Sequence, residues 1–325
     1  MARVTARDVA HAAGVSQATV SFVLNDRADQ AISQATKQAV LDAVHRLGYV
    51  PSGAARSLRS GRSSVALCVI PDLPVTEGME VFRRTLSRVL GRSGLTCVFL
   101  HAENGQPLTE LWPHVHPAVV LAFGPLAPAD AQHIRRTGIA LADDLLGTAG
   151  VPITGFDQAQ VGDLQVRHLA GRGHTRIGFG SVADPREAVI GVARLRGAEE
   201  ACRARGLPAP VVVPVDYTAP SGRAAVHRWR EAGVTAVAAF NDLVGLTLLA
   251  GARDTGLAVP GDLAVVGVDD LPVASLVDPM LTTVEIDAEV PATALARWIL
   301  AEAGMPVPDT GPTGPALRLL ERGTS

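Results

Sequence analysis

Residues 5–25, TARDVAHAAGVSQATVSFVLN, decide the fold of the first part of this chain. They form two short amphipathic segments around a tight turn at Gly14. Thr5 and Asp8 give the first segment a start that resembles a capping box, and Ser16 is placed to cap the second. Two short helices joined in this way are the sequence form of a helix-turn-helix, whose second helix enters the major groove of DNA. The sequence therefore predicts a DNA-binding headpiece.

The second helix of this pair has an inward side and an outward side. Val20 and Leu24 face the first helix, whereas the opposite side, which can meet base edges, carries Gln17, Ala18, Ser21 and Phe22. A third, supporting helix is expected over Ser33–Leu47, because apolar residues recur there at helical spacing and Gly48 stands in the stop position. The alternative is that these are three ordinary helices in the cap of an enzyme.

The stretch SGAARSLRSG at residues 52–61 can form a helix of about ten residues. Alone it is expected to be only marginally helical, because helix nucleation is costly and isolated helices this short do not hold in water. We therefore expect this segment to become helical on contact with DNA.

The headpiece and the RSLRSG stretch together resemble the lactose-repressor (LacI/GalR) family of bacterial transcription regulators, without a gap from about residue 3 to 62. The resemblance implies that Gln17 and Ala18 read the major groove together with position 22, and that Leu58 of a hinge helix at 51–62 wedges into the minor groove. An apolar wedge unstacks base steps in exchange for a bent duplex that contacts more protein. The candidate DNA-binding residues are Thr5, Ser16, Gln17, Ala18, Thr19, Ser21, Phe22, Asn25, Ala55, Arg56 and Leu58.

Phe22 is a departure from the family pattern, because many relatives carry arginine or another polar reader at this position. Phenylalanine cannot make the bidentate contact to guanine, although it can lie against a thymine methyl group. Gln17 can pair with adenine, whereas Ala18 offers no hydrogen bond. We therefore expect a different operator, unless Phe22 turns inward as part of the core, which is the alternative.

Charge is unevenly distributed along the chain. Residues 1–62 hold eight basic and four acidic side chains, whereas the remainder holds 21 basic and 28 acidic ones. Phosphate contacts dominate protein–DNA affinity, so the basic residues of the first part are candidates for backbone contacts: Arg3, Arg7, Arg27, Arg56, Arg59 and Arg62. For any single one, the alternative is a solvated surface arginine.

The remaining residues predict a two-lobed α/β body, because short apolar runs alternate with helical stretches. Buried parallel strands are expected at Val65–Ile70, Leu95–Leu100, Ala118–Ala122, Ile139–Ala142, Arg176–Gly180, Val211–Val215, Ala236–Phe240 and Leu263–Val268. Helices are expected near Val81–Arg92, Ala129–Thr137, Gln158–Arg172, Val189–Arg205, Ala219–Ala232, Leu243–Gly256 and Ala288–Ala303. Such winding favours a doubly wound fold with ligands at the carboxyl ends of the strands.

The second half carries a further resemblance, in DLQVRHLAGRGHTRIGFGS (163–181), ARLRGAEEA (193–201), AVAAFND (236–242) and LAVVGVDDLPVASLVDPMLTTVEID (263–287). These stretches are similar to the periplasmic-binding-protein-like core of the same family. The resemblance implies a first lobe of about 63–155 and 286–311, and a second of about 156–285 and 312–325. It places the crossings near residue 156, near Thr282–Glu285 and near Gly311, and a last strand at Ala316–Leu320.

The same resemblance implies effector-binding residues in the cleft between the lobes: Arg196, Asn241 and Asp269, with Asp143 from the first lobe. A guanidinium, an amide and a carboxylate together suit a polyhydroxylated or polar ligand. The alternatives are a surface role for Arg196 and a loop-capping role for Asp269. No aromatic platform for sugar stacking follows the first strand, so an effector other than a free sugar, or none, stays open.

Other chemistry finds little support in the sequence. No catalytic, metal or cofactor motif is recognisable, and the three scattered cysteines are typical of reduced, packed thiols. The start shows no signal peptide and no apolar run reaches a membrane span, which indicates the cytoplasm and opposes an exported solute-binding protein.

The sequence thus predicts a homodimeric repressor of transcription that binds a near-palindromic operator. A small molecule is expected to modulate the affinity of this repressor for DNA. The alternatives are an activator, an effector-independent regulator or a sugar-active α/β enzyme.

Overall fold

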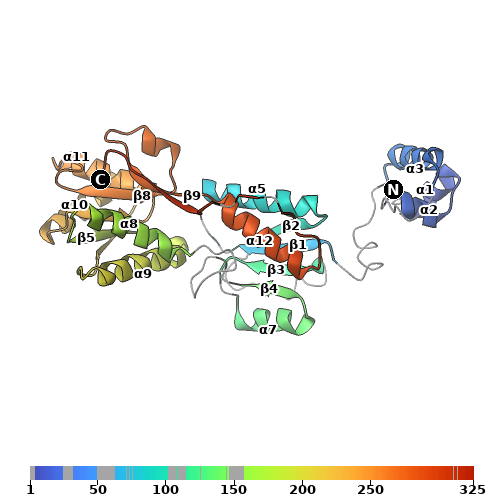
Figure 1. The fold of residues 1–325 in the computed structure, drawn as a ribbon, viewed down its shortest axis with the longest axis horizontal. Coiled ribbons are helices and arrows are strands. Elements are labelled where there is room, and N and C mark those ends of the chain that lie inside the picture. Colours follow the sequence, from blue (N-terminus) through green and yellow to red (C-terminus); the bar gives the residue numbers. More distant parts are fainter. Residues whose placement is uncertain are drawn as a thin grey trace. The chain divides into compact units, whose positions relative to one another are not determined.

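The computed structural model describes residues 4–24, 32–49, 63–70, 72, 74, 76–101, 108, 115–124, 126–143, 145, 157–309, 311–312 and 314–325. The chain divides into two compact units, residues 1–64 and 65–325 (Figure 1). The expected hinge helix at 51–62 lies outside the described residues. So do four of the candidate DNA-binding residues: Asn25, Ala55, Arg56 and Leu58.

The first unit contains three helices, α1 (Ala6–Ala13), α2 (Gln17–Leu24) and α3 (Gln34–Leu47). The start of α1 is fixed by Asp8, whose Oδ2 accepts hydrogen bonds from the Thr5 backbone amide at 2.8 Å and from the Thr5 hydroxyl at 2.7 Å. Gly14 ends α1 with φ 65°, a conformation that costs glycine little. The predicted helix-turn-helix is therefore confirmed in its helices and in its turn.

The small core of this unit lies between the three helices. Val9, Val20 and Val40 are fully buried there, one from each helix. Ser33 accepts a hydrogen bond from the Thr36 amide at 3.2 Å and caps α3, so this helix begins one residue later than expected. The three helices bury one another's apolar faces, which leaves the outer side of α2 free of core packing.

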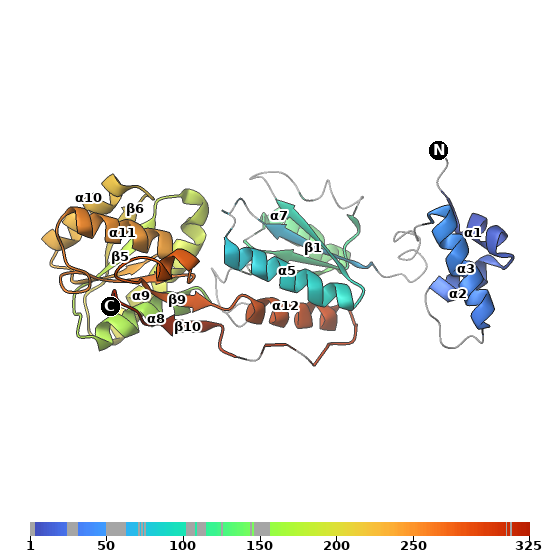
Figure 2. The same ribbon diagram turned by 90° about the horizontal axis from the view of Figure 1, so that it is seen from above.

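The body begins with a parallel four-stranded sheet of order β2-β1-β3-β4. Helices α5 (Glu77–Arg92) and α12 (Glu289–Glu302) cover one face, and α7 (Pro128–Thr137) covers the other (Figure 2). Each face of the sheet packs against its helices in a separate apolar core. Successive side chains of a strand point to opposite faces, so alternate residues enter different cores. The strands are β1 (Val65–Ile70), β2 (Thr96–His101), β3 (Val119–Ala122) and β4 (Ala140–Ala142).

The second sheet has six strands in the order β10-β9-β8-β7-β5-β6, parallel except for β10. Helices α8 (Ala159–Gly171) and α9 (Ala188–Ala204) cover one face, and α10 (Ala219–Glu231) and α11 (Asp242–Asp254) cover the other. The strands are β5 (Ile177–Val182), β6 (Val211–Val215), β7 (Ala236–Ala239), β8 (Ala264–Val268), β9 (Thr282–Ile286) and β10 (Leu317–Leu320).

The chain passes between the two sheets more than once. After β9, helix α12 packs into the core of the first sheet, and β10 then returns to pair with β9. The residues Thr282–Ile286 form β9, so the chain leaves the second sheet after Ile286, next to the expected crossing near Thr282–Glu285. In the described part of the chain, no helix is long and apolar enough to cross a membrane.

Candidate functional site

The exposed start of α2 is the first candidate site. Gln17 and Ala18 are both exposed there, with Ser16 beside them. Ser16 caps the helix, since its Oγ accepts a hydrogen bond from the Thr19 amide at 3.1 Å and lies 2.9 Å from the Thr19 hydroxyl. Thr5 is exposed, and its backbone amide donates a hydrogen bond to the carboxylate of Asp8. The two exposed residues most free to reach a ligand are thus Gln17 and Ala18.

Phe22 does not belong to the core of the headpiece. The apolar cluster of this unit takes Val20 as a fully buried member and Val23 and Leu24 as partly buried ones, whereas Phe22 is half-buried outside it. Thr19 and Ser21 are also half-buried. This placement opposes the alternative that Phe22 turns inward.

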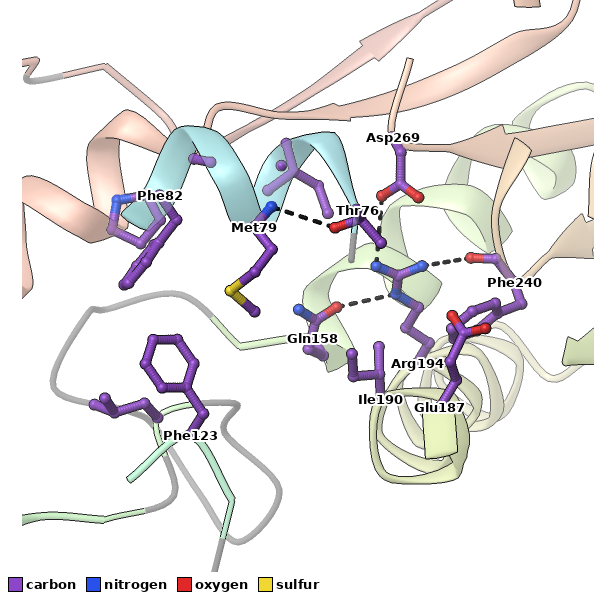
Figure 3. Close-up of a pocket in the computed structure, with 15 residues that line it drawn as sticks. Thr76, Met79, Phe82, Phe123, Gln158, Glu187, Ile190, Arg194, Phe240 and Asp269 are labelled. Atoms are coloured by element: carbon purple, nitrogen blue, oxygen red, sulfur yellow. Dashed lines mark hydrogen bonds and ion pairs between the residues drawn. The ribbon is translucent and has the colours of Figure 1, made fainter. Parts of the chain in front are cut away.

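The second candidate site is a pocket in the body, formed by residues from both sheet layers (Figure 3). Its walls come from α5, α9 and α12 and from the segments that follow β3, β7, β8 and β9. The lining residues are Thr76, Gly78, Met79, Phe82, Phe123, Leu145, Gln158, Glu187, Ile190, Arg194, Phe240, Asp269, Ile286, Ala288 and Pro291.

Arg194 is the most constrained polar group of the pocket, with only 4% of its surface exposed. Its Nε donates to Gln158 Oε1 at 2.9 Å, and one terminal nitrogen donates to the Phe240 carbonyl oxygen at 2.5 Å. The guanidinium also lies 4.8 Å from the centre of the Phe240 ring. Burial lowers its pKa, while the nearby carboxylate of Asp269 opposes this change. These contacts fix the guanidinium in one orientation.

Asp269 lies beside Arg194 in the wall of the pocket. Its Oδ1 lies 3.8 Å from the second terminal nitrogen of Arg194, which is too long for a hydrogen bond. The residue follows β8 with φ 100°, a backbone conformation that an aspartate adopts only under strain. Burial raises the pKa of this carboxyl group, and Arg194 opposes that rise. Such strain at a pocket wall is typical of binding sites, where the surrounding fold supports it.

Glu187 supplies the second acidic group. Its Oε1 accepts a hydrogen bond from the Tyr217 hydroxyl at 3.3 Å, and that hydroxyl in turn accepts one from Asn241 Nδ2 at 3.0 Å. Burial raises the pKa of Glu187, and it raises the pKa of Tyr217 to about 12. Asn241 is therefore buried behind the pocket, where it orients Tyr217, rather than among the residues that line it.

Arg194, and not the predicted Arg196, lines this pocket. Arg196 pairs with Asp157 at 3.3 Å and does not line the pocket. The reason is helix geometry: two residues correspond to about 200° around the axis, so Arg194 and Arg196 face opposite sides of α9.

Asp143 also lies away from this pocket. It forms an ion pair with Arg135 at 3.1 Å, and 42% of its side chain is exposed. Of the four predicted effector residues, only Asp269 lines the pocket.

Helical spacing could have identified the polar residues that the sequence reasoning missed. Glu187, Ile190 and Arg194 follow one another at intervals of three and four residues, so they share one face at the start of α9. Phe240 stands directly after β7, at the carboxyl end where ligands are expected. No sequence signal marked Gln158 or Tyr217.

No group of three or more candidate metal ligands occurs among the residues that the structure describes.

Comparison with known proteins finds similarity along nearly the whole chain. Residues 5–52 match the family "Bacterial regulatory proteins, lacI family", and residues 166–325 match the family "Periplasmic binding protein-like domain". The regulator CelR of Thermobifida fusca is 32% identical over 327 residues, which cover 92% of this chain and 91% of that protein.

Two solved structures are similar as well. The structure of the CelR–cellobiose complex is 28% identical, with a TM-score of 0.61 and coverage of 99% of this chain and 100% of the other. The Lac repressor dimer bound to operator and the anti-inducer ONPF has the same fold, with a TM-score of 0.77 at 23% identity and 99% coverage of both chains.

Proposed function

Because the chain belongs to the lacI family of bacterial transcriptional regulators, we propose that it represses transcription by binding a near-palindromic operator as a homodimer. Membership of this family makes the chain a DNA-binding regulator and not an enzyme. The observation that carries the proposal is the exposed start of α2, which presents Gln17 and Ala18 beside a capped helix end. Two-fold symmetry of a dimer then requires two half-sites.

The contacts to DNA are of three kinds: with bases in the major groove, with the backbone and with the minor groove. Gln17 pairs with adenine in the major groove, while Ala18 and Phe22 make apolar contacts, Phe22 with a thymine methyl group. Ser21 meets base edges on the same side of α2. The backbone is contacted by Thr5, Ser16 and Thr19 and, outside the described part, by Asn25, Ala55 and Arg56, and Leu58 enters the minor groove. The excess of basic over acidic side chains in residues 1–62, eight against four, supports phosphate binding.

The pocket of the body is the proposed effector site. The CelR–cellobiose complex, a structural relative at 28% identity, supports a small polar molecule as the effector. Arg194, Glu187 and Asp269 would hold it directly, and Asn241 would act through Tyr217. The site lies between the two sheet layers. A bound effector therefore favours one arrangement of these layers over another, and this change in the conformational equilibrium alters the affinity for DNA. We place this activity in the cytoplasm, where the DNA is.

The proposal is tested by selecting DNA fragments from a random library with the full-length chain at low ionic strength. We expect enrichment of one inverted repeat, bound with an affinity that falls steeply as salt rises. Gln17→Ala should weaken binding to that fragment by about tenfold, the value of one good base contact.

Gln38→Ala serves as the matched control, because it makes the same substitution at an exposed position on α3. There the side-chain amide donates to Asp42 of the same helix at 2.9 Å, so its loss should leave DNA binding nearly unchanged. A library without any enriched inverted repeat, with cell metabolites present and absent, would contradict the proposal.

A further inference from the structure

Two of the three cysteines lie on neighbouring strands of the first sheet. Cys68 is on β1 and Cys97 is on β2, and the two strands pair in the register Ala66↔Cys97 and Cys68↔Phe99. Because alternate residues of a strand share a face, both thiols point to the face that α5 and α12 cover. The third cysteine, Cys202, is fully buried on α9 in the core of the second sheet. Cys68 and Cys97 therefore form a thiol pair.

The two members of the thiol pair differ in their access to water. Among the described strands, β2 is at the edge of the first sheet, and its residues, Cys97 included, are half-buried or exposed. Strand β1 lies between β2 and β3, and Cys68 is fully buried there. A small oxidant from solution can therefore reach Cys97, whereas Cys68 is shielded.

The surroundings of Cys97 favour its thiolate form. Its sulfur accepts hydrogen bonds from the Cys68 thiol and from the Ser87 hydroxyl of α5, and these lower its pKa although burial opposes the change. The pKa of Cys68 is raised well above its usual range, because its thiol donates to Cys97 and because it is buried. Arg83, one turn before Ser87, adds a positive charge, since its guanidinium lies 4.7 Å from the centre of the Phe99 ring, opposite Cys68 in the register. An accessible thiolate beside a protonated thiol is typical of a redox-sensitive cysteine and its resolving partner.

We propose that the thiol pair is a modification site for hydroperoxides, at which Cys97 is oxidised first and Cys68 then closes a reversible disulfide. The Cys97 thiolate attacks one oxygen of the hydroperoxide, the O–O bond breaks, and the leaving alkoxide or hydroxide takes a proton from water. The Cys68 sulfur attacks the resulting sulfenic acid, and its proton goes to the departing hydroxide, so that water leaves as the S–S bond forms. The two thiols lose two electrons in all, and the hydroperoxide gains them.

Closure of the disulfide moves the edge strand. Neighbouring strands lie about 4.8 Å apart and two residues span about 6.6 Å, so Cα atoms with the offset of Cys68 and Cys97 are about 8 Å apart in a regular sheet. A disulfide usually needs a Cα separation of about 6.8 Å or less. Strand β2 can make this movement, because among the described strands it pairs only with β1. The bond formed is strained and hence easily reduced, which suits a reversible modification.

The test is oxidation of the full-length chain with a few equivalents of hydrogen peroxide, followed by alkylation with N-ethylmaleimide under denaturing conditions. We expect two of the three thiols to be lost. Tryptic digestion should then yield the peptides 63–83 and 93–135 joined by a disulfide, because each of them ends at an arginine and holds one member of the pair. Incubation of the oxidised protein with reduced glutathione should restore all three thiols.

Variants separate the roles of the two cysteines. Cys97→Ser should leave Cys68 reduced at the same concentration of peroxide, because the buried thiol is shielded. Cys68→Ser should stop the oxidation at a sulfenic acid on Cys97, which dimedone traps. Ser87→Ala should slow disulfide formation by about three- to tenfold, since the thiolate loses one hydrogen bond. Cys202→Ser, the matched control outside the pair, should form the disulfide at the rate of the parent.

Three results overturn the inference: three free thiols after oxidation, a sulfinic or sulfonic acid at Cys97 without a disulfide, or a disulfide between any other cysteines, within one chain or between two. Mapping of the parent protein distinguishes these results even if a variant does not fold. The inference stands apart from the proposed function, because the chemistry needs neither DNA nor an effector.

Discussion

The buried carboxylate of Asp242 accepts a hydrogen bond of 2.6 Å from the hydroxyl group of Thr283, which joins the start of α11 to strand β9. Its other oxygen accepts from the backbone amide of Leu271 at 2.7 Å. One side chain thus connects a helix start, the loop that follows Asp269, and the strand that leads to the first sheet layer. Burial raises the pKa of Asp242 to about 7 despite both hydrogen bonds.

This pKa predicts a stability that falls as the pH rises. The reference pKa of an aspartate is 3.8, and the folded value is about 7, so the folded state binds the proton more tightly than the unfolded state. The protonated Asp242 therefore stabilises the folded state. This stabilisation is fully present below about pH 4 and is lost as the pH rises to about 7. In Asp242→Asn the amide can donate to Thr283 Oγ and its oxygen can accept from Leu271, without titrating. Relative to the parent, the variant should therefore gain a few kcal/mol between about pH 4 and pH 7.

Urea unfolding of the full chain at several pH values measures this difference. Asp254→Asn is a control, because this aspartate lies at the other end of α11, where it pairs with Arg223 on the surface. A parent and an Asp242→Asn variant whose stabilities run parallel from pH 4 to pH 8 would show that the carboxylate is not desolvated as the structure indicates.

Phe22→Arg should change the base preference of the protein without a loss of stability. Because Phe22 lies outside the headpiece core, a charged side chain there remains in water. Arginine can bind guanine with two hydrogen bonds, whereas phenylalanine cannot. DNA selection with parent and variant should therefore yield half-sites that differ at one position, with guanine favoured by the variant. A variant that melts at a clearly lower temperature would place Phe22 in the core instead.

Leu58→Ala should weaken binding to the selected operator far more than binding to random DNA. The prediction follows from the sequence, since position 58 lies outside the described residues. A minor-groove wedge contributes only where the duplex bends, whereas phosphate contacts act on any duplex. Titrations with operator and random fragments at one salt concentration give the two losses. Equal losses on both kinds of DNA would contradict the role of a wedge.

The sequence alone predicted the elements more accurately than the site. Strand Val65–Ile70 was predicted to the residue, because a short, continuous apolar run is typical of a parallel strand that is buried on both faces. The turn at Gly14 followed from local chemistry in the same way. The pocket was harder, because its residues come from distant parts of the chain. The resemblance implied both Asp269 and Arg196. Asp269 lines the pocket, whereas Arg194 lines it in place of Arg196, because the resemblance did not fix the rotation of α9.

Gly178 occupies the second sheet at a place that only glycine fills without strain. A Cβ atom there would lie 2.6 Å from Nε1 of Trp229, an indole that is fully buried and donates to the Val211 carbonyl at 2.8 Å. Gly178→Ala must therefore displace the ring or break this hydrogen bond, at a cost of about 1–3 kcal/mol. Gly171→Ala is the matched control, because the last residue of α8 has open space at its Cβ position and alanine favours the helix. Urea unfolding followed by tryptophan fluorescence should show a destabilised Gly178→Ala and an unchanged or slightly stabilised Gly171→Ala. Equal stability of the two variants would mean that the indole moves aside without cost, contrary to the close packing seen around it.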